Sequence, residues 1–216
     1  MTPKHIVVAA SLFVLAACNS SQTRTAALIE PDPAELAKPA PDSFKVQFET
    51  SKGHFTVMAY RAWSPLGVDR FYFLVNNHFY DGARFFRTLP NFVVQFGLNG
   101  DPKVSKAWET RSIKDDSVKQ SNQAGFLTYA MGGPNTRTTQ IFINKVDNSR
   151  LDAMGFAPFA KIIDGMHVVE QFYAGYGEGA PRGGGPDQGM IRTQGNAYLE
   201  RMFPKLDSIA KAKVIK

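Results

Sequence analysis

Short apolar segments recur along the chain with turn residues between them, and this pattern limits the possible folds more than any other feature. Residues 44–48 and 55–57 alternate apolar with polar side chains, as half-buried strands do, and Gly53 between them suits a hairpin turn. Many short strands with few helices predict a mainly β fold, built as an antiparallel barrel or sandwich. The other predicted strands span residues 92–96, 126–130, 140–144, 159–163 and 209–215.

Helices are predicted in three places. Ser64 has the character of an N-cap and Pro65 that of a first helical residue, and apolar side chains then recur at helical spacing as far as Asn77. A second helix is predicted over residues 166–173, after an Asp-Gly turn. A short third helix is predicted over residues 196–203, where a proline follows and stops it.

Residues 1–17 have the layout of an export signal. Lys4 supplies a positive charge, and residues 6–17 form an apolar run that is too short to cross a bilayer as a helix. The run ends in small residues before Cys18, the only cysteine of the chain. This resembles a bacterial lipoprotein signal, in which Cys18 is acylated and becomes the first residue of the mature protein. The alternative is an ordinary secretory signal with a chance cysteine, which would leave a free thiol.

A lipid on Cys18 would anchor the chain in a membrane of the cell envelope, facing the periplasm. Asn19 after the cysteine is not acidic, which by the same resemblance favours the outer over the inner membrane. Residues 18–42 hold Ser, Thr, Ala and four prolines without apolar periodicity. They are predicted to form a flexible Pro-rich tether.

Residues 43–216 have the length of one domain, within which residues 175–204 form a Gly-rich insertion. The formal net charge of +6 comes without a basic run, so no binding of nucleic acid is predicted. The insertion lacks the phosphate-binding motifs, the histidines show no metal-ligand spacing, and the usual hydrolase motifs are absent. The sequence therefore predicts neither a metal nor a cofactor.

Two segments place polar side chains among aromatic and branched apolar neighbours. Residues 85–95 contain Arg87 and Gln95, and residues 133–143 contain Gln140. Arginine is almost never buried without a partner, so a groove with an apolar floor and a few hydrogen-bonding groups is a good explanation. Such a groove suits a proline within a peptide, which is apolar, uncharged and carries a carbonyl. The plainer alternatives are that the apolar side chains are core residues and that Arg87 pairs with a carboxylate such as Asp101.

The same segments resemble the cyclophilin family of peptidyl-prolyl cis-trans isomerases. The first block is Phe85-x-Arg87-x-x-Pro90-x-Phe92-x-x-Gln95. The second comprises Ala130, Gly133-Pro134-Asn135-Thr136 and Gln140-Ile141-Phe142-Ile143, and the third comprises Leu151-Asp152 and Phe159-Ala160-Lys161-Ile162. The resemblance implies a closed eight-stranded antiparallel β-barrel capped by two helices, with a short extra C-terminal helix in this chain.

The resemblance also implies roles for individual residues. Arg87 would donate a hydrogen bond to the prolyl nitrogen, and Gln95 would hold Arg87 and the substrate carbonyl. A pocket for the proline ring would be formed by Phe92, Val93, Phe142 and Leu151, with Phe156 as a further wall where the third block departs from the family pattern. Backbone groups of Met131 would bind the substrate, and Ala130 and Gln140 would line the neighbouring groove.

The resulting hypothesis is a prolyl isomerase that assists the folding of exported proteins at the cell envelope. Its partners would be proline-containing unfolded or exposed polypeptide segments, with no nucleic acid, and the chain is expected to be a monomer. Two alternatives remain open at this point. One is a chaperone-like module that binds proline segments with little turnover, and the other is an envelope scaffold in which the insertion binds a partner.

Overall fold

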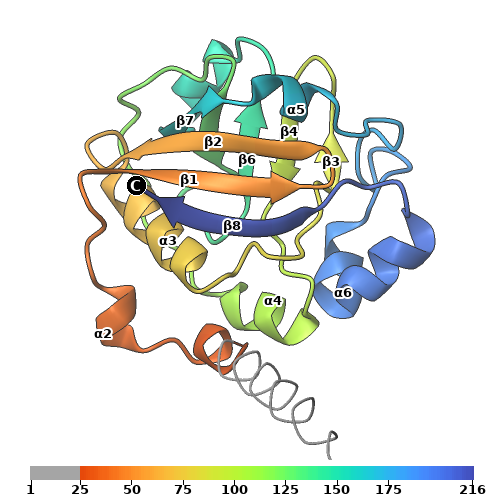
Figure 1. Cartoon of the computed structure of the whole chain (residues 1–216), viewed down its shortest axis with the longest axis horizontal. Coiled ribbons are helices and arrows are strands. Elements are labelled where there is room, and N and C mark those ends of the chain that lie inside the picture. Colours follow the sequence, from red (N-terminus) through yellow and green to blue (C-terminus); the bar gives the residue numbers. More distant parts are fainter. Residues whose placement is uncertain (1–24) are drawn as a thin grey trace, which may run out of the picture.

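Eight antiparallel strands form one curled sheet in the computed structural model of the chain, which describes residues 25–216 (Figure 1). Across the sheet the strands follow the order β3-β4-β6-β5-β7-β2-β1-β8. The strands are β1 (Ser43–Thr50), β2 (Gly53–Tyr60), β3 (Arg87–Thr88), β4 (Val93–Phe96), β5 (Phe126–Tyr129), β6 (Ile141–Asn144), β7 (Pro158–Asp164) and β8 (Ile209–Ile215).

The sheet is an open half-barrel, so the predicted closed barrel is wrong. Its two end strands are β3 and β8, and β3 has only two residues, too few to form a ladder with β8. In their place, an isolated bridge joins Arg84 to Ser208. Backbone hydrogen bonds from residues 82–85 to residues 207–209 hold the two ends near each other without completing the ladder.

The helices lie at the edges and ends of the sheet (Figure 1). The predicted helix after Ser64 is confirmed, but its cap differs from the prediction. The Ser64 hydroxyl does not cap the helix and donates instead to the carboxylate of Asp116, which accepts from the N–H groups of Leu66 and Gly67. The helices are α2 (Pro33–Leu36), α3 (Pro65–Asn76), α4 (Pro102–Trp108), α5 (Met166–Glu170) and α6 (Gln188–Met202), with a 3₁₀ helix η1 (Ser149–Met154).

The predicted helix over residues 196–203 is the second half of the longer α6. Gly195 interrupts α6 with a φ of 59°, and Asn196 begins the second half by donating its backbone N–H to the carbonyl of Gly100. A Cβ at position 195 would lie 2.0 Å from that carbonyl oxygen, so only glycine allows this approach. The kink therefore packs α6 against the chain that leads into α4.

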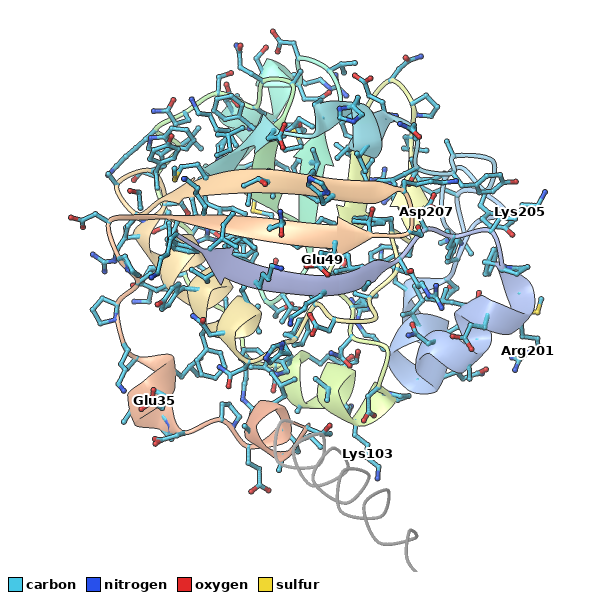
Figure 2. All side chains as sticks on the ribbon, in the orientation of Figure 1. Glu35, Glu49, Lys103, Arg201, Lys205 and Asp207 are labelled. Carbon is cyan, nitrogen blue, oxygen red and sulfur yellow. The ribbon has the colours of Figure 1, made fainter. Side chains whose placement is uncertain are left out.

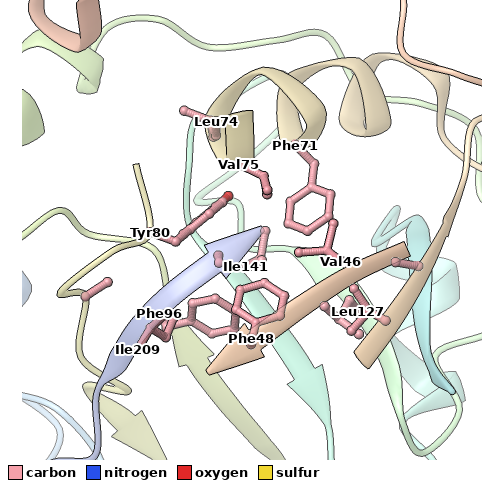
Figure 3. Close-up of a cluster of buried hydrophobic side chains, with 14 of the residues drawn as sticks. Val46, Phe48, Phe71, Leu74, Val75, Tyr80, Phe96, Leu127, Ile141 and Ile209 are labelled. Atoms are coloured by element: carbon pink, nitrogen blue, oxygen red, sulfur yellow. The ribbon is translucent and has the colours of Figure 1, made fainter. Parts of the chain in front are cut away.

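The main core lies between the curled sheet and α3 (Figure 3). Alternate residues of β1, Val46 and Phe48, are fully buried, as the period of a strand requires. Phe71 of α3 packs on Phe48 with ring centroids 6.4 Å apart, and Tyr80 and Phe96 close the cluster from the side. The strand and helix periodicities thus meet in one aromatic-rich core.

Residues 25–42, the described part of the predicted tether, do not extend freely from the domain. Residues 25–29 form a helical turn, and Leu28 is buried. The indole of Trp108 donates to the Leu28 carbonyl, and the N–H of Ala40 donates to Asp69. Ala40 is buried as well, Ile29 and Leu36 pack against the core, and Arg111 donates to the Ile29 carbonyl. These scattered contacts dock a segment that lacks periodicity.

The predicted signal over residues 1–17 and the predicted acylation site Cys18 lie outside the described residues. Within residues 25–216, no helix is both long and apolar enough to cross a membrane.

Asp207 joins three parts of the chain just before β8 (Figure 2). Its carboxylate accepts from the Ser51 hydroxyl in the β1–β2 turn and from the backbone N–H of Tyr173 after α5. Farther along, Glu49 on β1 pairs with Lys213 on β8. These contacts fix the free end of the sheet beside the segment that leads into the insertion.

Candidate active site

Strand register brings the predicted catalytic residues into one row. Arg87 in β3 pairs with Gln95 in β4, and Gln95 pairs with Phe142 in β6. Directly paired residues of antiparallel strands point to the same face of the sheet. Three side chains from two distant segments of the sequence therefore meet on one surface.

A hydrogen-bond chain orders the polar side chains of this row. The Nη1 of Arg87 donates to Oε1 of Gln95 over 3.1 Å, and Nε2 of Gln95 donates to Oε1 of Gln140 over 2.9 Å. Both glutamines are 8% exposed, so each amide orientation is set by its neighbour rather than by water. The predicted contact between Arg87 and Gln95 is present, and Gln140 supports it from behind.

An apolar pocket opens beside Arg87. Val93, Phe142 and Leu151 form a small buried cluster of their own, separate from the main core, and Phe92, Ala130 and Phe156 pack against it. Phe156 meets Phe142 edge-on, with ring centroids 5.8 Å apart. A cavity of about 370 Å³ is lined by nine of the predicted site residues, namely Arg87, Phe92, Val93, Gln95, Ala130, Met131, Phe142, Leu151 and Phe156.

Gln140, the tenth predicted residue, faces a neighbouring cavity of about 320 Å³. Gln95, Ala130 and Met131 line both cavities, so the two form a continuous groove. The N–H of Ala130 donates to the Gln140 carbonyl, which fixes the rim between them. The structure thus brings all ten predicted residues into one groove, and their chemical roles stay predictions.

Asp152 holds the η1 wall of the pocket in place. Its carboxylate accepts from the hydroxyl of Ser121 and from the backbone and side-chain N–H groups of Asn122. Burial alone would raise the pKa of Asp152, but these hydrogen bonds stabilise the charged form, and the net result is a lowered pKa. Asn122 also donates to the Phe156 carbonyl, so the network reaches the pocket lining.

Replacing Asp152 with Ala should therefore weaken the fold locally. Ser121 and the fully buried Asn122 lose their acceptor, and we expect the free energy of unfolding to fall by about 1–3 kcal/mol. Urea denaturation measures this change. The matched control is Asp164→Ala, which removes an exposed carboxylate at the end of β7. An equal loss in both variants would show that the Asp152 network adds nothing.

The partner of Arg87 is Glu178, a residue that sequence reasoning missed. Nε and Nη2 of Arg87 donate to the two carboxylate oxygens of Glu178 over 2.6 and 2.7 Å. The hydrogen bond from Arg87 lowers the pKa of Glu178 and outweighs the opposing effect of burial. The suggested partner Asp101 instead caps α4 through the N–H of Lys103. A signal was present, since Glu178 is the only acidic residue in the Gly-rich stretch 175–186.

The insertion also forms part of the pocket wall. Residues 178–182 and Gln188 line the cavity opposite the apolar cluster. On the other side, the guanidinium of Arg150 lies 4.9 Å from the ring centroid of Phe92, and that of Arg87 lies 5.5 Å from it. In residues 25–216 no cluster of His, Cys, Asp or Glu could hold a metal ion. The chemistry available here is hydrogen bonding by Arg87 and Gln95 beside an apolar pocket.

Comparison with known proteins adds a family context to this geometry. The family model described as cyclophilin type peptidyl-prolyl cis-trans isomerase/CLD matches residues 45–186. A peptidyl-prolyl cis-trans isomerase from Acinetobacter baylyi is 34% identical over 131 residues, which cover 58% of this chain and 70% of that protein. Peptidyl-prolyl cis-trans isomerase-like 1 from Emericella nidulans is 31% identical over 129 residues, covering 58% of this chain and 79% of that protein.

Solved structures show the same fold. A cyclophilin type peptidyl-prolyl cis-trans isomerase from Cryptosporidium parvum superposes with a TM-score of 0.60 at 18% identity, covering 81% of this chain and 98% of that one. The structure of the same protein in the presence of the dipeptide Ala-Pro gives a TM-score of 0.58, covering 80% of this chain and 99% of that one.

Proposed function

Because the chain belongs to the cyclophilin-type family of peptidyl-prolyl cis-trans isomerases, a family of isomerase enzymes, we propose that its Arg87 groove isomerises X–Pro bonds of exposed polypeptide segments. One observation carries the proposal. A guanidinium with two N–H groups not used by Gln95 or Glu178 lies at the edge of an apolar cavity that remains open. No metal, nucleotide or covalent intermediate is required.

The reaction needs only positioned hydrogen bonds. Rotation about an X–Pro bond breaks amide resonance against a barrier of about 18–20 kcal/mol. The prolyl nitrogen then regains its lone pair, and an N–H of Arg87 can donate to it. That bond is stronger in the twisted transition state than in the planar ground state, which is the condition for catalysis. Arg87 is 16% exposed, so the hydrogen bond forms where little water competes.

The apolar cluster supplies the other half of the mechanism. The ring of the proline would lie on Val93, Phe142 and Leu151, which are at most 6% exposed and present only carbon surface to the cavity. If the pocket holds the proline ring still while the preceding carbonyl rotates, the binding energy of the ring is used to orient the substrate for the reaction. The structure of the Cryptosporidium relative in the presence of Ala-Pro supports a proline-containing ligand for this fold.

An NMR exchange assay tests the activity. The full chain, kept in solution with a mild detergent, is added to a short peptide with one X–Pro bond. Uncatalysed isomerisation takes roughly 10–100 s at room temperature, so exchange cross-peaks between cis and trans signals on the sub-second scale require catalysis. Their absence, with a folded protein that still binds the peptide, would favour the module that binds proline segments with little turnover.

The proposed location is the cell envelope, with a lipid on Cys18 and the domain facing the periplasm. The support is the residue pattern of positions 1–19, with the outer membrane favoured by Asn19. In this reading the enzyme assists the folding of exported proteins.

Replacing Cys18 with Ser should release the protein from the membrane. Without the thiol no acyl chain can be attached, and a stable membrane anchor is lost. In a bacterial host fed an alkyne-labelled fatty acid, we expect label on the wild type in the membrane fraction and none on Cys18→Ser. Label on both proteins, or none on the wild type, would contradict the lipoprotein proposal and leave the isomerase proposal unaffected.

A further inference from the structure

Glu178 links the Gly-rich insertion to Arg87 through two hydrogen bonds. We propose that Glu178 is a positioning residue, which holds the guanidinium of Arg87 in the orientation that the isomerisation requires. The inference rests on the proposed function of the Arg87 groove. It adds a residue that lies outside the three motif blocks of the sequence, although within the residues that the family model matches.

The geometry leaves Arg87 fixed yet able to act. Arginine carries five N–H groups in a rigid plane. Glu178 accepts two of them at 2.6 and 2.7 Å, and Gln95 accepts a third at 3.1 Å. Two N–H groups on Nη1 and Nη2 take no part in these bonds. Since Arg87 lines the open cavity, these groups are the ones available to a substrate.

Glu178 is itself held in place by the backbone of the insertion. The N–H of Gly179 donates to its Oε1 over 3.1 Å, and the N–H of Gly185 donates to its carbonyl oxygen over 2.9 Å. The two sides of the loop lie so close together that a Cβ on Gly183 would be 2.4 Å from the Glu178 carbonyl oxygen. The glycine run is therefore what lets the loop close on itself and aim the carboxylate at Arg87.

The base of the loop is anchored beside Arg87. Tyr176 packs edge-on against Tyr173 and Phe203, with ring centroids 4.9 and 5.0 Å apart. Tyr176 and Phe203 also pack against a second buried cluster that includes Phe86, the residue before Arg87, and Leu98. The insertion and the segment that leads into β3 thus pack on one apolar cluster, which connects the two ends of the ion pair.

Fixing Arg87 in advance should matter for the rate. Its long side chain has many rotamers, and a substrate that had to order it would lose part of its binding energy. Two bonds to a carboxylate and one to Gln95 order it before the substrate arrives. The hydrogen bonds that lower the pKa of Glu178 keep its carboxylate ionised at neutral pH, so the pair is present where the enzyme works.

The alternative is that Glu178 blocks Arg87 instead of positioning it. A carboxylate that takes two N–H groups also lowers the net charge of the site, and it could withhold Arg87 from the substrate. The two roles differ in sign. Loss of a positioning residue slows the reaction, whereas loss of a blocking residue speeds it.

The test compares Glu178→Ala and Glu178→Gln with the wild-type full chain in the NMR exchange assay. We expect kcat/KM to fall about 3- to 10-fold for Glu178→Ala, mainly through kcat. The amide of Glu178→Gln retains one acceptor, so that variant should keep an intermediate rate. When Arg87 is already Ala, Glu178→Gln should not change the rate any further. The matched control is Glu200→Gln, which removes an exposed ion pair between the same insertion and Arg84.

A second measurement reports on the pair directly. The Nε–H resonance of Arg87 should be shifted and slow to exchange with water in the wild type, and should lose both properties in Glu178→Ala. Faster or unchanged catalysis in Glu178→Ala would overturn the inference while leaving the proposed isomerase intact. An inactive wild type would overturn both. A lost fold in Glu178→Ala would be visible in its amide spectrum, and Glu178→Gln would then decide the sign.

Discussion

Arg87→Ala is expected to reduce kcat/KM for isomerisation of an X–Pro peptide by about 10²- to 10³-fold. The reason is that, among the described residues, Arg87 is the cation that both lines the cavity and lies in the row with Gln95 and Phe142, whereas Arg182 only lines the cavity. Its hydrogen bond to the prolyl nitrogen strengthens as the amide twists, so the loss should fall on kcat more than on KM. Arg87→Lys should also be slow, because an ammonium cannot make the planar fork to Glu178 and still reach the substrate.

Two controls separate this effect from damage to the fold. Arg84→Ala removes an arginine of the same chain segment whose side chain pairs with the exposed Glu200, and this variant should leave the rate unchanged. Arg87→Ala also strands the partly buried carboxylate of Glu178, so the double variant Arg87→Ala with Glu178→Gln should regain stability and remain slow. A rate within threefold of the wild type in a folded Arg87→Ala would remove Arg87 from the centre of the mechanism.

Local pattern was sufficient for most of the sheet. Seven of the eight strands correspond to predicted segments, from residues 44–48 to residues 209–215. Each of these segments shows the alternating or continuous apolar pattern that burial of one or both faces of a strand requires. β3 was not predicted, since two residues carry no period. The sheet stays open because β3 is too short to form a ladder with β8. The prediction of a closed barrel came from the family resemblance and not from the residue pattern.

The groove could be predicted because its members lie in short motifs. Arg87 and Gln95 are eight residues apart on a hairpin, and their pairing follows from the turn between them. Glu178 is 91 residues from Arg87, and the contact depends on where a glycine loop returns. No period or propensity encodes that return. The docking of residues 28–40 was missed for the same reason, because the scattered apolar residues that dock, Leu28, Ile29, Leu36 and Ala40, follow no period.

The cap of α3 illustrates this limit and leads to the second large effect. Ser64 and Pro65 satisfied the local signature of a helix start, yet the carboxylate at that start belongs to Asp116. Asp116 also accepts from Nη2 of Arg137 over 3.0 Å, and the side chains of the pair are only 5% and 3% exposed. Asp116 therefore caps a helix and, together with Asp115, whose Oδ1 lies 3.3 Å from Nε of Arg137, compensates a buried cation.

Asp116→Ala is accordingly expected to lower the free energy of unfolding by about 3–5 kcal/mol. The variant leaves the N–H groups of Leu66 and Gly67 without their acceptor. It also removes the nearer of the two carboxylates beside buried Arg137 and leaves Asp115. Thermal and urea denaturation measure the loss, with Asp164→Ala as the exposed control.

A double-mutant cycle identifies which role of Asp116 dominates. Arg137→Met removes the buried cation and keeps an apolar side chain over Tyr129, whose ring centroid lies 5.7 Å from the guanidinium. If weaker compensation of the Arg137 charge, with Asp115 alone beside it, causes most of the loss, the double variant should be more stable than the sum of the two single effects predicts. The reason is that Arg137→Met removes the charge that Asp116→Ala leaves poorly compensated. If the two effects are simply additive, the loss in Asp116→Ala comes from the helix cap instead. The Asp116 carboxylate would then stabilise the start of α3 independently of its ion pair with Arg137.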